Sequence, residues 1–102
     1  MRVFRRSRFL LDVAEELTWL NEKAGSEVAE AWYGSLKETI SQLERHPHLG
    51  RERKDLQQAG IRSWRLTRVP RWLIFYEATE DKVILYRVRQ GTMNLEALKI
   101  RR

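Results

Sequence analysis

The chain has 102 residues and a formal net charge of +6, and its length predicts a single domain over residues 1–102 rather than a multidomain protein. It contains no cysteine, which excludes disulfides and thiolate zinc sites and is consistent with a reducing cytosol. The apolar run near the N-terminus is too short for a signal peptide or a membrane span, so we expect a cytoplasmic protein with no membrane association.

The charge is divided unevenly along the chain. Residues 1–8 carry four arginines and no acid, residues 9–50 carry three bases and eight acids, and residues 51–102 carry thirteen bases and six acids. Two basic flanks around an acidic middle predict one face suited to an acidic partner, either a nucleic acid or an acidic protein segment. The alternative is that the charge only keeps a small protein soluble.

The N-terminal part is predicted to form a strand and a helix. Residues 2–5 are short and β-prone, and Ser7 after them can cap a helix. From Phe9 onwards apolar residues recur every three or four positions, which predicts a helix over about residues 8–23. The acids of this segment, Asp12 among them, are expected to point away from the apolar face.

A second helix is predicted to follow almost at once. Gly25 suits the left-handed backbone that often ends a helix, and Ser26 can cap the next one. The apolar spacing then continues until His46 and Pro47 end the helix. Because the linker is so short, the two helices should form an antiparallel hairpin whose shared apolar face needs a cover.

The second half is predicted to supply that cover. A polar, turn-rich loop leads to three strand candidates at about residues 62–68, 72–78 and 82–89, which short turns should make antiparallel. A short segment, TMNLEALKIRR, ends the chain. The predicted fold class is therefore α+β: a strand, an antiparallel helix hairpin, a three-stranded antiparallel sheet and a short C-terminal segment.

One face of this sheet is expected to be open. Both alternating sets of side chains in the middle strand are apolar, which is typical of a strand covered on both faces, and the helix hairpin can cover one face alone. In the last strand we expect Ile84, Tyr86 and Val88 to share one face. The predicted open surface has an apolar floor and a cationic part. The floor is Leu73, Phe75 or Leu85, and the cations are Arg62, Arg65, Arg87 and Arg89.

Four short motifs resemble, in their order and spacing, the RelE/ParE superfamily of toxins from type II toxin–antitoxin modules, and specifically its ParE-like branch. They are P-x-x-G-R at 47–51, G-x-R at 60–62, LIFY at 73–76 and YRVRQG at 86–91. The resemblance covers nearly the whole chain. It implies a toxin neutralised by a ParD-like antitoxin, whose acidic amphipathic C-terminal tail folds on the toxin to form a hetero-oligomer. The residues expected to contact the antitoxin, or else to lie in the core, are Trp19, Trp32, Leu73, Phe75 and Leu85.

The resemblance leaves two activities open, because ParE-like members are known as inhibitors of DNA gyrase and RelE-like members as ribosome-dependent mRNA endoribonucleases. A ribonuclease could use Lys54, Arg62 and Arg87 as phosphate-binding cations. In RelE-like ribonucleases, however, Tyr or His after the last strand does part of the proton transfer, and the segment QGTMNLEALKIRR has neither. Gln90 itself stands where many ParE-like sequences carry His, a departure that also leaves a weak toxin or an unusual target open. We therefore expect a protein that inhibits gyrase by binding, through Arg62, Arg65, Arg87 and Arg89. The ribonuclease and an inactive, antitoxin-binding module are the alternatives.

No cofactor and no metal site are predicted. His46 and His48 flank Pro47 without a third ligand in reach, and Glu52 with Lys54 is more typical of a solvated loop than of an acid–base pair. A DNA-binding repressor is a further alternative, but the second helix is acidic, unlike the recognition helix of a helix-turn-helix.

Overall fold

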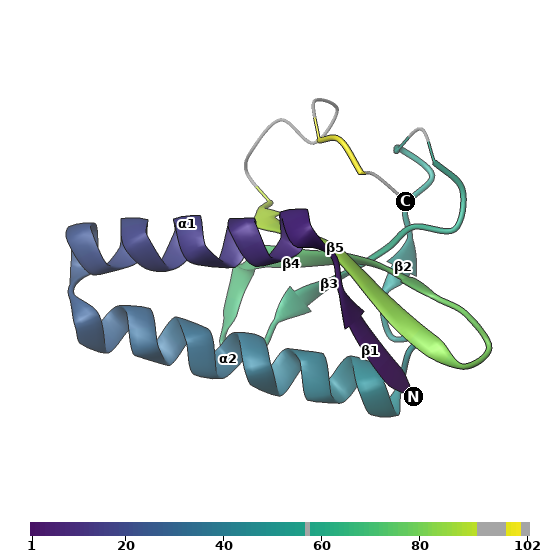
Figure 1. Ribbon diagram of the computed structural model, residues 1–102, viewed down its shortest axis with the longest axis horizontal. Helices are drawn as coiled ribbons and strands as arrows, with labels where there is room; N and C mark the ends of the chain where they lie inside the picture. Colours follow the sequence, from purple (N-terminus) through teal and green to yellow (C-terminus); the bar gives the residue numbers. More distant parts are fainter. Residues whose placement is uncertain (57, 92–97, 101–102) are drawn as a thin grey trace.

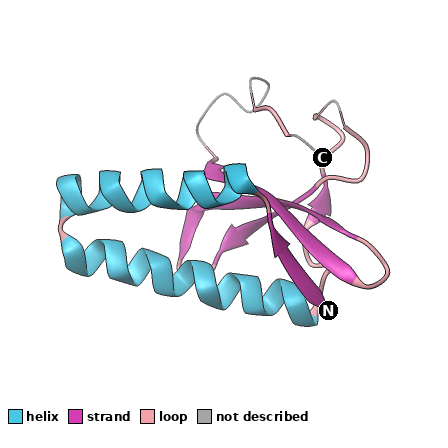
Figure 2. Cartoon of the chain, in the orientation of Figure 1, coloured by secondary structure: helices cyan, strands magenta, loops and turns pink. Residues whose placement is uncertain are grey.

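The computed structural model describes residues 1–56, 58–91 and 98–100, and in this part of the chain two helices pack on a mixed sheet (Figure 1, Figure 2). The elements in order are β1 (Arg2–Arg5), α1 (Ser7–Ala24), α2 (Ser26–Arg45), β2 (Arg51–Glu52), β3 (Arg62–Leu66), β4 (Val69–Ala78) and β5 (Lys82–Gln90). The predicted α+β class is confirmed. Neither α1 nor α2 is long and apolar enough to cross a membrane.

The sheet has two more strands than predicted among the described residues, in the order β1-β5-β4-β3-β2. The three central strands are antiparallel neighbours, as expected. β1 pairs in parallel with β5, and the two-residue β2 pairs with β3. Neither pairing has a local signal, because the first joins the two ends of the chain and the second involves too few residues to show a period.

The two helices begin and end within one residue of the predicted positions. Figure 1 shows them antiparallel, joined at the end of the molecule remote from β1. Gly25 has a φ of +94°, in the positive region that glycine tolerates best. The predicted caps were wrong, because Ser7 and Ser26 are the first residues of their helices. Arg6 and Gly25 take the cap positions, without a side-chain hydrogen bond.

The main core lies between the helices and the sheet. Phe9 and Trp32 from the helices meet Ile74 and Leu85 from the sheet, and all four are buried. Trp32 packs edge-to-face on Trp72, with ring centroids 6.2 Å apart. Edge-to-face packing is the favourable geometry for an aromatic pair.

The second face of the sheet is covered over β4, so the expectation of an open face was wrong there. Phe75 is 0% exposed, and it lies in a second core with Ile61, Tyr86 and Ile100. Ile61 comes from the end of the loop before β3, and Ile100 from the C-terminal segment. The side chain of Gln58 donates a hydrogen bond to the carbonyl of Ile100 (2.6 Å), which joins the two covering segments.

A β-bulge explains why the predicted faces of β5 were also wrong. The register shifts where Phe75 pairs with Arg87 and Tyr76 pairs with Leu85, which leaves Tyr86 as an extra residue. Leu85 and Val88 therefore both reach the helix-side core, although strict alternation puts them on opposite faces.

Candidate functional site

Asp12 is the centre of a buried charge network between α1 and β5. Its carboxylate is 0% exposed and accepts hydrogen bonds from Arg87, at 2.7 Å from Nε and 3.2 Å from Nη2. It also accepts the backbone N–H of Val88 at 3.1 Å. β1 stops pairing with β5 at the Arg5–Leu85 pair, and beyond that point Asp12 takes the place of a strand as the partner of Val88. Asp12 therefore points inward, contrary to expectation.

Two further arginines approach the same carboxylate. Arg8 lies at 3.4 Å and Arg89 at 3.7 Å from Asp12, and both also reach Glu15 at 3.8–3.9 Å. Arg87 additionally donates to the carbonyl of Lys99 (2.9 Å), which ties the C-terminal segment to the network. The structure thus brings two of the expected target-binding cations together, but around an internal carboxylate. Arg87 is buried, and the side chain of Arg89 is 18% exposed.

The other two expected target-binding cations lie on β3, with β4 between them and β5. Arg62 is half-buried and donates to the carbonyl of Gly50 at 2.7 Å. Arg65 is exposed, with its guanidinium carbon 4.7 Å from the ring centre of Trp64. Arg62 and Arg65 have opposite parity in the strand, so the four arginines do not form one patch. Lys54, the third cation considered for a ribonuclease, is exposed in the loop after β2.

The P-x-x-G-R motif has a structural reason. The buried hydroxyl of Tyr76 accepts the backbone N–H of Gly50 at 2.8 Å and donates to the carbonyl of Pro47 at 2.7 Å. A Cβ on Gly50 would lie 2.6 Å from the carbonyl oxygen of Ser63 and 2.7 Å from the hydroxyl of Tyr76. Burial raises the pKa of the Tyr76 hydroxyl from its ordinary value.

Arg53 supports the second core, although it was not among the predicted site residues. It is 5% exposed, and its guanidinium carbon lies 5.6 Å from the ring centre of Phe75. It donates to Ser63 at 3.1 Å and to Asp55 at 2.8 Å. The hydrogen bond from Arg53 lowers the pKa of the Asp55 carboxyl to about 2. A charged residue in a polar loop carries no sequence signal of burial.

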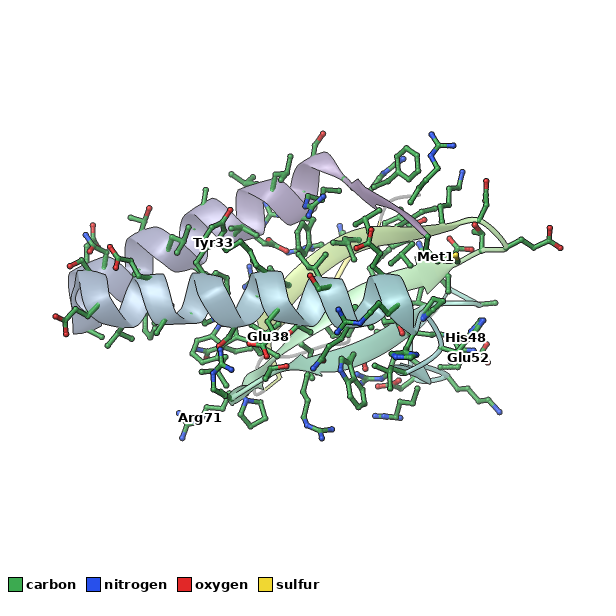
Figure 3. All side chains as sticks on the ribbon, turned by 90° about the horizontal axis from the view of Figure 1, so that it is seen from below. Met1, Tyr33, Glu38, His48, Glu52 and Arg71 are labelled. Carbon is green, nitrogen blue, oxygen red and sulfur yellow. The ribbon has the colours of Figure 1, made fainter. Side chains whose placement is uncertain are left out.

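His46 and His48 are both exposed. Figure 3 shows His48 and Glu52 towards the end of the view that also holds Met1, with Arg71 towards the other end. Within residues 1–56, 58–91 and 98–100, no group of three His, Cys, Asp or Glu side chains could hold a metal ion.

The residues expected to contact an antitoxin divide into two groups. Trp32, Phe75 and Leu85 are buried, and Leu73 is half-buried. Trp19 on α1 is 46% exposed. The helices expose further large apolar side chains, namely Leu10, Leu11, Val28 and Tyr33.

A groove of about 430 Å³ lies between the two helices near the turn that joins them. Leu17 and Thr18 of α1 line one side, and Ala29 and Tyr33 of α2 line the other. Figure 3 labels Tyr33 on α2. Of the large exposed apolar side chains of the helices, Tyr33 lines this groove.

Three comparisons with known proteins agree with this fold and with the motifs. Residues 3–95 match the family model described as the ParE toxin of the type II toxin–antitoxin system parDE. The chain is 33% identical over 76 residues to Toxin ParE3 of Caulobacter vibrioides, an alignment that covers 74% of this chain and 72% of that protein. Its fold resembles a chain of the chromosomal ParDE TA system from P. aeruginosa, with a TM-score of 0.73 and 16% identity. That match covers 88% of this chain and 95% of the other.

The family match spans nearly the whole chain, and the resemblance predicted from the motifs is confirmed. The chain therefore belongs to the ParE toxin family of type II toxin–antitoxin systems.

Proposed function

We propose that this toxin acts in the cytoplasm by binding and inhibiting DNA gyrase, and that a ParD-like antitoxin neutralises it. The observation that carries the proposal is the engagement of Arg87 by Asp12. A ribonuclease needs guanidinium N–H groups free to stabilise the charge that develops on phosphate. Arg87 is buried and bonded to Asp12 and to the Lys99 carbonyl, so those donors serve the fold.

The other candidate nuclease residues support the same conclusion. Arg62 donates to the carbonyl of Gly50, which leaves Lys54 as the exposed member of the three. A single exposed ammonium can supply charge and donate one proton, but it does not supply the general base that RNA cleavage also requires. Inhibition by binding needs only an accessible surface, and Arg65 stacked on Trp64 offers one on β3.

The target is tested by adding the purified toxin to gyrase supercoiling reactions and to a translation reaction programmed with a defined message. We expect supercoiling to stop and the message to stay intact. Addition of the antitoxin should restore supercoiling. Ribosome-dependent cleavage of the message would overturn the proposal in favour of a ribonuclease. Inactivity in both reactions, with retained antitoxin binding, would indicate a non-toxic binding module.

We assign the antitoxin to the exposed apolar surface of the helix hairpin. An acidic amphipathic tail needs apolar contacts for its hydrophobic face, and buried residues such as Phe75 cannot provide them while other residues cover them. Leu11 and Trp19 on α1, with Tyr33 beside the groove, are accessible in the free toxin. Trp and Tyr side chains are frequent anchors of protein interfaces.

Substituting Trp19→Ala is expected to weaken antitoxin binding roughly 30-fold, because loss of an aromatic anchor typically costs about 2 kcal/mol or more. The fold should be retained, since Trp19 lies outside both cores. Isothermal titration calorimetry with the antitoxin tail measures the loss. The matched control is Leu49→Ala, an exposed apolar residue in the loop after α2, which should leave the affinity unchanged. Equal weakening by both substitutions would contradict the assignment to the helices.

A further inference from the structure

A cavity of about 590 Å³ lies where β1, β5 and the start of α1 meet. Four of its lining residues are cationic, namely Arg5, Arg6, Arg8 and Lys82, and none is acidic. Its apolar wall is formed by Phe4, Ile84 and Tyr86. The cavity lies at the β1 edge of the sheet, and its lining includes none of the residues proposed to bind the antitoxin.

The cations of this cavity are mostly not neutralised. Arg5, Arg6 and Lys82 form no ion pair within the described part of the chain. Arg8 makes only long contacts to Asp12 and Glu15, at 3.4 and 3.8 Å. An anion that entered the cavity would therefore meet three cations that no carboxylate of the described residues pairs with.

Aromatic rings keep two of these cations beside the cavity. The ammonium of Lys82 lies 5.5 Å from the ring centre of Phe4, and the guanidinium of Arg6 lies 6.0 Å from that of Tyr86. The hydroxyl of Tyr86 donates to Glu77 at 2.9 Å, so this carboxylate, which is not part of the lining, is already engaged. The cation–π contacts restrict the long side chains, which lowers the entropy that an anion must remove on binding.

The start of α1 adds to the positive potential around the cavity. Its first turn contains no acidic residue, and Arg6 at the cap position makes no side-chain hydrogen bond to the helix. The partial positive charge of the helix start is therefore not compensated by a carboxylate of the same turn.

We propose that this cavity binds a phosphate group. An arginine guanidinium can donate two parallel hydrogen bonds to the oxygens of one phosphate. Lys82 on β5 adds an ammonium, so the phosphate can be contacted by cations from more than one side. Two sources have this chemistry, a free or terminal phosphate and the backbone of a nucleic acid. The inference does not depend on gyrase being the target, because it concerns residues to which the proposed function gives no role.

The full-length chain is tested with a fluorescently labelled single-stranded oligonucleotide, with inorganic phosphate as competitor and a poly-glutamate peptide of equal charge as the alternative probe. The double substitution Arg5→Gln with Arg6→Gln should weaken oligonucleotide binding about tenfold. It should also reduce the salt dependence of log Kd by about 1.4, the value for two lost phosphate contacts on a single strand. The double control Lys23→Gln with Arg71→Gln removes the same charge from exposed positions elsewhere and should change binding less than about twofold.

The competitor separates the two sources. Displacement by inorganic phosphate would support a site for a single phosphate group, whereas affinity that rises with oligonucleotide length would support backbone binding. Equal weakening by the two double variants, or equal binding of poly-glutamate with the same dependence on Arg5 and Arg6, would overturn the proposal. If the Arg5 and Arg6 variant fails to fold, as judged by circular dichroism, the single substitution Lys82→Gln decides between these outcomes.

Discussion

Substitution of Asp12 by alanine is expected to destabilise the fold by about 3–5 kcal/mol, because removal of one member of a buried ion pair leaves an uncompensated charge inside the protein. Arg87 would lose its carboxylate, and the N–H of Val88 would lose its acceptor. For a domain of this size the melting temperature should fall by about 12 °C or more. Thermal and urea unfolding followed by circular dichroism measure the change.

Two matched variants separate charge from geometry. Asp12→Asn keeps one oxygen that can accept the Val88 N–H but loses the charge, so it should cost less than alanine and still be clearly destabilising. Glu15→Gln removes a carboxylate from the same helix at a side chain that is half exposed, and the expected change is below about 1 kcal/mol. A loss of similar size for Asp12→Ala and Glu15→Gln would contradict the view that Asp12 is the centre of the network.

Substitution of Gly50 by alanine should destabilise the protein by about 2–4 kcal/mol, since a clash in a packed site and a broken buried hydrogen bond act together. The added Cβ meets a backbone carbonyl, that of Ser63, which cannot move away as the end of a flexible side chain could. The Tyr76 hydroxyl, on the other side, would be pushed away from the Gly50 N–H and the Pro47 carbonyl. Urea unfolding of the purified variant measures the loss.

The control for Gly50 is another glycine of the same chain. Gly34 lies inside α2, and a Cβ there would have no heavy atom within 4 Å. Gly34→Ala should therefore stabilise the protein by about 0.5–1 kcal/mol, through higher helix propensity. Tyr76→Phe isolates the hydrogen bonds from the clash, with an expected cost of about 1–3 kcal/mol. If Gly50→Ala is as stable as the wild type, the backbone of Gly50 does not lie as close to Ser63 and Tyr76 as described.

The two helices and the three central strands could be predicted from the sequence, because each is long enough to show the apolar spacing of its secondary structure. The three-and-four spacing from Phe9 gives α1, and Gly25 divides it from α2, as observed. The α+β class followed from the order of these elements. The parallel pairing of β1 with β5 could not be predicted, because it depends on which sheet edge is free once all the strands have formed.

The site was harder to predict because its residues depart from the regular spacing of apolar and polar positions. Asp12 follows Phe9 by three positions, so it lies on the same side of the helix as this buried residue. This position indicates that the Asp12 side chain is buried. The prediction that it points away from the apolar face rested only on its charge. The cover of Phe75 comes from Ile61 and Ile100, which belong to segments without periodicity. The bulge at Tyr86 then moved Val88 to the helix side.

The pairing of β1 with β5 has a consequence for the order of folding. It joins residues 2–5 to residues 82–85, and the hydrogen bond from Arg87 to Asp12 spans a similar distance along the sequence. Contacts between residues so far apart in the sequence must close a long loop, so they form more slowly than contacts between neighbouring strands. We therefore expect the β1 edge of the sheet and the charge network of Asp12 to form after the local pairing of β3, β4 and β5.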